Sequence, residues 1–145
     1  MFYGEYLHSI DRKGRLILPA KIRDVAKAHF IEKFFVTAGL DKCLFMFSEE
    51  EWHSQEGKFK ALSLTKQQGR IFNRLFFSSA QEVVPDKQGR ILLPQYLKEL
   101  ANIKKEVVIV GVSSRIEIWA KDVWGEFNKN YRASYEEIAE KLMEI

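Results

Sequence analysis

Residues 11–19 read DRKGRLILP, and residues 86–94 read DKQGRILLP. The two stretches begin 75 positions apart, and the same Asp, Gly, Arg, Leu and Pro recur at five of their nine positions. Three other positions exchange similar residues, and only Lys13 and Gln88 differ in character. Because self-similarity along a chain is typical of repeated structural units, this repeat is the feature from which the fold is predicted.

A second match follows each copy in the same order. The stretch GLDKCLFMFSEEEW, from Gly39, aligns with GVSSRIEIWAKDVW, from Gly111, and places Trp52 opposite Trp124. Two collinear matches predict two structural repeats with two further helical segments. We expect a first repeat at 5–52, a linking helical segment at 53–79, a second repeat at 80–124 and a C-terminal helix at 125–145.

Each repeat is predicted to contain a strand, a turn, a short strand, a short helix and a β-hairpin. An Asp at the first turn position and a Gly at the fourth favour a type I turn, so Asp11, Gly14, Asp86 and Gly89 are expected to be structural turn residues. A Pro then ends each short strand and suits a helix start. The expected ranges are 6–10, 16–18, 20–29, 34–38 and 44–47 in the first repeat, and 82–85, 91–93, 95–101, 107–110 and 116–119 in the second.

The remaining segments are predicted to be helical. Ser48 and Thr65 each open a capping-box pattern, with Glu or Gln three residues later. The second pattern precedes apolar residues at helical spacing within 71–76. Residues 121–145 also favour helix, with an interruption near Ser134.

One repeat of about 45 residues buries too little apolar surface to fold alone, and its strands would leave open edges. Two repeats could pair their strands around one shared core. The sequence therefore predicts an α+β fold in which each copy supplies half of a common barrel, with flanking helices.

Composition limits the class of protein. Hydrophobic residues make up 46% of the 145-residue chain and charged residues 30%, as in ordinary globular proteins. No apolar run reaches the roughly 20 residues that span a bilayer, and the N-terminal stretch lacks the pattern of a signal peptide. Cys43 is the single cysteine, so no intramolecular disulfide can form. These features predict a cytoplasmic protein without a membrane partner.

Positive charge is concentrated on the repeated stretch. The net charge of the whole chain is only +3, whereas residues 11–23 carry +4 and residues 86–98 carry +2. Residues 134–145 carry −3. A clustered basic region is the electrostatic footprint of nucleic-acid binding. The distribution of charge, more than the net charge, therefore indicates the turns as a binding region.

The pattern offers no catalytic or metal site. His8, His29 and His53 have no ligand spacing, and Cys43 precedes an apolar strand, where it is expected to be a small packing residue. The offset of Asp11 from Gly14 suits a turn better than acid catalysis. We therefore expect no enzyme activity, no metal, no cofactor and no small-molecule substrate.

The first 23 residues, MFYGEYLHSIDRKGRLILPAKIR, resemble the start of the MraZ family of bacterial proteins. The pattern DxxGR, an apolar triplet and Pro, present twice, is that family's signature, and Ile10 and Ile22 are small departures from it. The family belongs to the AbrB/SpoVT/MazE-like group of DNA binders, so the resemblance implies a pseudo-symmetric double-split (swapped-hairpin) β-barrel of two AbrB-like repeats. It further implies a sequence-specific transcriptional regulator of the division and cell-wall gene cluster. Such a protein would be a cytoplasmic, nucleoid-associated homo-oligomeric ring, octameric as the resemblance implies, on repeated boxes of double-stranded DNA.

The resemblance and the charge pattern together give the candidate DNA-binding residues. An Arg just beyond the turn can reach a guanine edge, and cations at the corner can neutralise phosphates. In the second turn Gln88 replaces a cation, which leaves open whether that turn contacts DNA or mainly builds the barrel. Cations on the following helix suit phosphates or a solvated face about equally. The candidates are Arg15, Lys13 and Arg12 in the first turn, Arg90 and Lys87 in the second, and Lys21 and Arg23 on the helix.

An oligomeric protein-interaction module of antitoxin type is the alternative function. Such a module would use a disordered C-terminal tail to wrap its partner, whereas the periodic Ile138, Leu142 and Ile145 predict a packed helix. The chain is also rich in aromatic residues, and we expect some of them to lie between subunits. The candidates for this are Phe72, Phe76, Phe77, Trp124 and Phe127.

Overall fold

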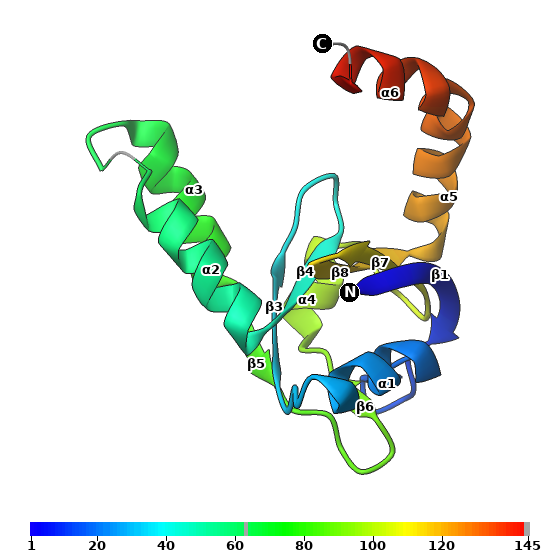
Figure 1. The fold of residues 1–145 in the computed structure, drawn as a ribbon. Coiled ribbons are helices and arrows are strands. Elements are labelled where there is room, and N and C mark those ends of the chain that lie inside the picture. Colours follow the sequence, from blue (N-terminus) through cyan, green and yellow to red (C-terminus); the bar gives the residue numbers. More distant parts are fainter. Residues whose placement is uncertain (63, 144–145) are drawn as a thin grey trace.

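The computed structural model describes residues 1–62 and 64–143. Its helices and strands follow the predicted order in both repeats (Figure 1). The strands are β1 (Phe2–Ser9), β2 (Arg15–Ile17), β3 (Phe34–Ala38), β4 (Leu44–Ser48), β5 (Gln81–Val83), β6 (Arg90–Leu92), β7 (Glu106–Ser113) and β8 (Arg115–Ala120). The helices are α1 (Ala20–Ala28), α2 (Glu49–Lys60), α3 (Gln67–Ser78), α4 (Gln95–Leu100), α5 (Lys121–Tyr131), a 3₁₀ turn η1 (Arg132–Ser134) and α6 (Tyr135–Met143).

Six of the strands form one antiparallel sheet in the order β1-β7-β8-β4-β3-β5. The hairpins β3–β4 and β7–β8 occupy the middle and meet where β4 pairs with β8. The first strand of each repeat then joins the hairpin of the other repeat, since β1 pairs with β7 and β5 pairs with β3. The two repeats are therefore interlocked within one sheet.

The remaining strands, β2 and β6, come from the two copies of the repeated stretch and pair with each other as a separate antiparallel ribbon. A single bridge, Ile10 to Leu16, links β2 to the end of β1. The larger sheet is open, with β1 and β5 at its edges, so the expected closed barrel is not confirmed. Each ribbon strand is only three residues long and a Pro follows soon after it, which stops its ladder from extending into the sheet.

The core is shared by both repeats. Leu16 and Ile91 are fully buried and lie directly opposite each other in the ribbon. Ile22 of α1 and Leu97 of α4 are also buried in this cluster, beside apolar residues of the central hairpins. Because apolar side chains of both copies fill one interior, neither repeat has a core of its own.

Aromatic clusters anchor the helices that lie outside the repeats. Trp52 of α2 stacks between Phe35 of β3 and Phe76 of α3, with ring centroids 5.2 and 5.6 Å away. In the hairpin of the second repeat, Trp119 of β8 contacts Trp124 and Phe127 of α5, with ring centroids 5.2 Å apart in each pair. These contacts fix the roots of both helical segments on the sheet.

The helical segments project from the body away from the turns. In Figure 1, α2 and α3 extend to the upper left and α5 and α6 to the upper right, whereas α1, β6 and the loop before β6 lie at the bottom. We call α2–α3 and α5–α6 the two arms, and the end that carries the repeated stretch the turn end. No helix among the described residues is long and apolar enough to cross a membrane.

The predicted elements differ from the structure mainly at their ends. β1 begins at Phe2 because residues before Tyr6 also pair with β7. Ser48 caps α2, and its Oγ accepts a hydrogen bond from the Glu51 backbone N–H at 3.2 Å, as the capping-box pattern predicts. The helix start predicted at Thr65 falls one residue early, because α3 begins at Gln67 with Lys66 in the cap position. The interruption predicted near Ser134 is present as η1, and residues 144–145 of the predicted helix lie outside the described part.

Candidate nucleic-acid interface

The Asp11 carboxylate organises the first turn. Its Oδ1 accepts hydrogen bonds from the backbone N–H groups of Lys13 and Arg15, both at 2.9 Å, and its Oδ2 accepts one from Nε of Arg15 at 2.7 Å. The Gly14 N–H donates to the Asp11 carbonyl at 3.0 Å, which is the bond that closes a β-turn. One short acidic side chain therefore holds the turn and the arginine that follows it.

The second turn has the same geometry. Oδ1 of Asp86 accepts from the backbone N–H groups of Gln88 and Arg90 at 2.9 Å, and Oδ2 accepts from Nε of Arg90 at 2.8 Å. The Gly89 N–H donates to the Asp86 carbonyl at 2.9 Å. The change from Lys13 to Gln88 leaves this framework intact, because the framework uses only the backbone of that residue.

Hydrogen bonding keeps both turn carboxylates ionised. The backbone N–H of Arg15 is the largest cause that lowers the pKa of Asp11, and the guanidinium of Arg15 adds to it. The backbone N–H of Arg90 lowers the pKa of Asp86 in the same way. Each turn thus holds a stable negative charge that is already used by its own N–H groups.

The two turn glycines have backbone angles that other residues rarely adopt. φ is +80° at Gly14 and +79° at Gly89. A side chain at these positions would strain the backbone, which explains why both copies of the repeated stretch carry glycine here.

The ribbon presents its two arginines on one outer face. In the antiparallel register, Arg15 lies opposite Leu92, and Ile17 lies opposite Arg90. Leu16 and Ile91 point to the core, so these four residues share the opposite face. Leu92 is 58% exposed and Ile17 is 37% exposed. This face therefore combines two positive groups with two accessible aliphatic side chains.

The two copies of the turn are tied to each other. The Leu18 N–H donates to the Gly89 carbonyl at 2.8 Å, and the Leu93 N–H donates to the Gly14 carbonyl at 2.9 Å. Each turn is thus hydrogen bonded to the strand end of the other repeat. The ribbon and both turns form one hydrogen-bonded unit at the turn end of the molecule.

The cations at the corners of the turns are exposed and unpaired. Arg12, Lys13 and Lys87 are accessible to solvent and form no ion pair within residues 1–62 and 64–143. Some cations elsewhere are neutralised, for example Lys33 by Glu49 at 2.7 Å and by Glu82 at 3.4 Å. The turn end therefore presents positive charge that the chain itself leaves available.

The two helix candidates are placed differently. Nε of Arg23 donates to the Leu18 carbonyl at 3.0 Å, and its side chain lies against Gly89 of the second turn. Lys21 instead lines a hollow beside the start of β1, together with Tyr3 and Tyr6. The structure thus brings Arg23 to the turns, whereas Lys21 lines a separate hollow.

Sequence reasoning missed Lys98. This residue follows Pro94 by four positions, as Arg23 follows Pro19, and its Nζ lies 3.6 Å from the place where a Cβ of Gly14 would be. Aligning the two helices behind the repeated stretch would have found it.

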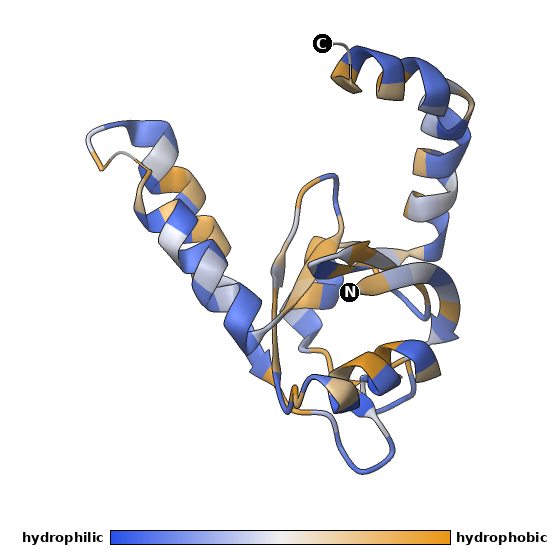
Figure 2. Cartoon of the chain, viewed as in Figure 1, coloured by the Kyte–Doolittle hydropathy of each residue, from blue (hydrophilic) through white to orange (hydrophobic). Residues whose placement is uncertain are grey.

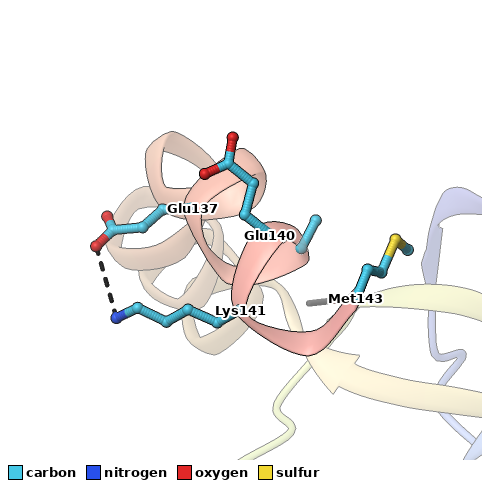
Figure 3. A pocket seen from close by; sticks show the side chains of 5 residues that line it. Glu137, Glu140, Lys141 and Met143 are labelled. Atoms are coloured by element: carbon cyan, nitrogen blue, oxygen red, sulfur yellow. Dashed lines mark ion pairs between the residues drawn. The ribbon is translucent and has the colours of Figure 1, made fainter. Parts of the chain in front are cut away.

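Nothing in the described part of the chain gathers three or more His, Cys, Asp or Glu side chains that could hold a metal ion. Burial raises the pKa of the Cys43 thiol to about 12, so this cysteine is a poor nucleophile. A hollow of about 590 Å³ on α6 is lined by Glu137, Glu140, Lys141 and Met143 (Figure 3). The Glu137–Lys141 pair in it is 3.7 Å apart on the exposed face of one helix, and offers no catalytic arrangement.

Comparison with known proteins supports the resemblance. The family model of the MraZ protein, described as antitoxin-like, matches the chain twice, over residues 1–75 and 76–144. The chain belongs to the MraZ family. Each of the two MraZ matches contains one copy of the turn and one strand of the ribbon.

Curated MraZ proteins are similar over the full length. The chain is 51% identical over 145 residues to the transcriptional regulator MraZ of Carboxydothermus hydrogenoformans, covering 100% of this chain and 99% of that protein. The same values hold for the transcriptional regulator MraZ of Thermoanaerobacter sp. strain X514. The transcriptional regulator MraZ of Acetivibrio thermocellus is 50% identical over 142 residues, covering 98% and 96%.

Proposed function

We propose that the chain is a transcriptional regulator that binds double-stranded DNA through the ribbon β2–β6 and the two flanking turns. The observation that carries the proposal is the pairing of both copies of the repeated stretch into one unit whose corner cations have no internal partner among the described residues. Its full-length relatives are named transcriptional regulators. In this proposal the chain has no catalytic role.

The shape of the unit suits the major groove. That groove is about 12 Å wide and admits a two-stranded β-ribbon. Arg15 and Arg90 would enter it on the same face, where guanidinium groups can donate to guanine O6 and N7. Ile17 and Leu92 on that face are suited to contact thymine methyl groups.

Within this proposal the residues divide into two groups. Arg15 and Arg90 read bases, because Asp11 and Asp86 fix each guanidinium through Nε and leave its terminal amino groups available. Arg12, Lys13, Lys87 and Arg23 neutralise phosphates and set the affinity. Lys21 is the weakest candidate, because the hollow that it lines lies beside β1.

The target and location follow from the family resemblance. We propose that the protein acts at repeated promoter boxes of the division and cell-wall gene cluster, and is a cytoplasmic, nucleoid-associated protein. We also propose that residues 5–52 and 80–124 are the two AbrB-like repeats. The exchange of β1 and β5 between hairpins supports an opened form of the swapped-hairpin barrel.

We further propose that the protein assembles into a ring, octameric as the resemblance implies. The support is the apolar surface of the two arms. Leu75 of α3 is 64% exposed and Leu142 of α6 is 80% exposed, and Figure 2 shows apolar residues along both arms. A ring would present many identical turns, so that binding at one box raises the effective concentration at the next.

An antitoxin-type interaction module is the second candidate, because the matching family model is described as antitoxin-like. Such a module would bind a protein through a tail that folds on its partner. In this chain α6 continues as a helix to Met143, which favours the DNA-binding proposal.

The test is a footprint of the protein on the DNA upstream of its own gene, with Arg15→Ala as the comparison. We expect evenly spaced protection by the wild-type protein, and loss of the specific protection with Arg15→Ala, at unchanged circular dichroism. The bidentate contact is worth about 1–3 kcal/mol at each site. Uniform cleavage in the presence of folded wild-type protein would overturn the proposal, and normal protection by the variant would remove Arg15 from the reading role.

A further inference from the structure

The helices behind the two turns carry a cation at the same position. Arg23 of α1 and Lys98 of α4 each lie four residues after the Pro that opens the helix. Each of them lies against the turn of the other repeat. Arg23 packs on Gly89, and Lys98 lies beside Gly14.

The hydrogen bonds between the repeats explain why each cation lies against the turn of the other repeat. The Gly89 carbonyl binds the N–H of Leu18, which directly precedes Pro19 and α1. The Gly14 carbonyl likewise binds the N–H of Leu93, which directly precedes Pro94 and α4. Each turn is therefore held against the helix start of the other repeat, and the cation one turn further along that helix reaches it.

The two cations differ in how much of their bonding capacity the chain uses. Nε of Arg23 donates to the Leu18 carbonyl at 3.0 Å. Lys98 is half-buried, and its ammonium has no hydrogen bond or ion pair among the described residues. The carboxylate of the adjacent turn is engaged within its own turn, where Asp11 accepts three hydrogen bonds from Lys13 and Arg15, and it forms no ion pair with Lys98.

An ammonium in this position is suited to a phosphate. Lysine is a compact point charge that can bind a phosphate oxygen without the geometric demands of a bidentate contact. Arg12 and Lys13, the corner cations of the first turn, are also unpaired within residues 1–62 and 64–143. A DNA strand that contacts this turn would lie close to Lys98, because Lys98 lies beside Gly14.

We infer that Lys98 is a phosphate-binding residue of the first turn, and that each turn of this protein completes its DNA contact with a cation from the other repeat. This inference rests on the proposed DNA-binding function. It also gives the second turn a role in binding, because Arg23 supplies there a positive charge that Gln88 does not.

The test compares the salt dependence of DNA binding for wild type and Lys98→Gln. The probe is a duplex from the upstream region, titrated between 50 and 300 mM KCl by fluorescence anisotropy. We expect the slope of log K against log salt to fall by about 0.9 for each contacting subunit, and affinity at 0.15 M salt to fall roughly fivefold for each phosphate that no longer has a lysine partner. Preference for the upstream duplex over a scrambled one should not change, because a phosphate contact carries no sequence information.

Two variants control for other causes. Lys98→Arg should restore the slope, and Lys60→Gln, an exposed lysine on the α2 arm, should leave it unchanged. A slope equal to wild type for Lys98→Gln, while wild type binds the duplex, would overturn the inference and leave the proposed function standing. Weaker binding with an unchanged slope and a lower melting temperature would also overturn it, and would assign Lys98 a purely structural role. If wild type binds no duplex, both the inference and the proposed function fail.

Discussion

Single residues at the turn end combine a structural role with the DNA-binding role proposed for them. The sequence places Arg15 just beyond the turn, and the structure holds its guanidinium on Asp11 at 2.7 Å. The pair is solvent exposed, so it contributes little to stability. Within the proposed function the pair orients the side chain, because a guanidinium fixed through Nε can present its terminal amino groups to a base at a lower entropic cost.

The turn carboxylates predict how stability depends on pH. Because hydrogen bonds lower the pKa of Asp11 and Asp86 in the folded chain, their contribution is fully present above the ordinary value of 3.8. It is lost as the pH falls through the lowered values. We therefore expect Asp11→Asn to melt below wild type at pH 7, and the difference to shrink when both are melted below pH 3.8.

The control for this prediction is Asp24→Asn on α1, a position without an ion pair in the described part of the chain. Its melting temperature should follow wild type across the same pH range. A gap between Asp11→Asn and wild type that stays constant down to the lowest pH would show that the carboxylate charge is not what stabilises the turn.

Cys43 gives a second prediction at this scale. Its thiol is buried, hydrogen bonded to the Leu40 carbonyl at 3.1 Å, and has a pKa raised to about 12 by burial. At pH 8 a thiol reagent such as Ellman's reagent should react with the native protein far more slowly than with the urea-unfolded protein. Comparable rates in the two states would contradict the buried position of this side chain.

Sequence reasoning was effective for residues whose role depends on local chemistry. The Asp and Gly of each turn could be predicted because their spacing alone determines a turn. Lys98 could not be assigned from its own repeat, since its neighbour in space, Gly14, lies 84 positions earlier in the chain. The aromatic residues expected between subunits illustrate the same limit. Phe76, one of them, is 4% exposed and packs among Trp52, Phe59 and Phe77 of its own chain.

At the scale of elements, the short strands and helices of each repeat are positioned by contacts with the other repeat. The order of elements within each repeat followed from alternation, turn residues and prolines. The pairing of β2 with β6 and of β1 with β7 depends on contacts about 75 and 105 residues apart, which no local pattern specifies. For the same reason the open edges of the sheet were not foreseen.

Substitutions at two glycines distinguish the effect of backbone strain from that of helix propensity. Gly89 has φ +79°, and a Cβ there would collide with the Arg23 side chain, whereas Gly57 lies within α2 with open space around it. Gly89→Ala should lower the free energy of unfolding by about 1–2 kcal/mol, and Gly57→Ala should raise it by up to about 1 kcal/mol. Urea unfolding of both variants measures the two changes. A Gly89→Ala protein as stable as wild type would argue against a turn that requires positive φ.

At the scale of the whole molecule, charge and apolar surface lie at different ends. Residues 11–23 and 86–98 concentrate a charge of +6 at the turn end, whereas the rest of the chain carries −3. The exposed apolar side chains of the arms project away from it (Figure 2). In the proposed ring, this separation would let subunits associate through the arms while the turns remain free for DNA.

The separation predicts that assembly and DNA contact can be uncoupled. Leu75 is exposed on α3, so Leu75→Glu should leave the chain folded and reduce its assembly, whereas Phe76→Glu should unfold it by burying an unpaired charge among aromatic rings. The folded Leu75→Glu protein should bind a one-box duplex as wild type does. It should lose the additional affinity that wild type gains on three adjacent boxes, because that gain comes from linking identical sites. Light scattering together with one-box and three-box titrations measures both effects. If wild type proves monomeric and binds three boxes no more tightly than one, the arms do not serve assembly, and each chain acts on DNA through its two turns alone.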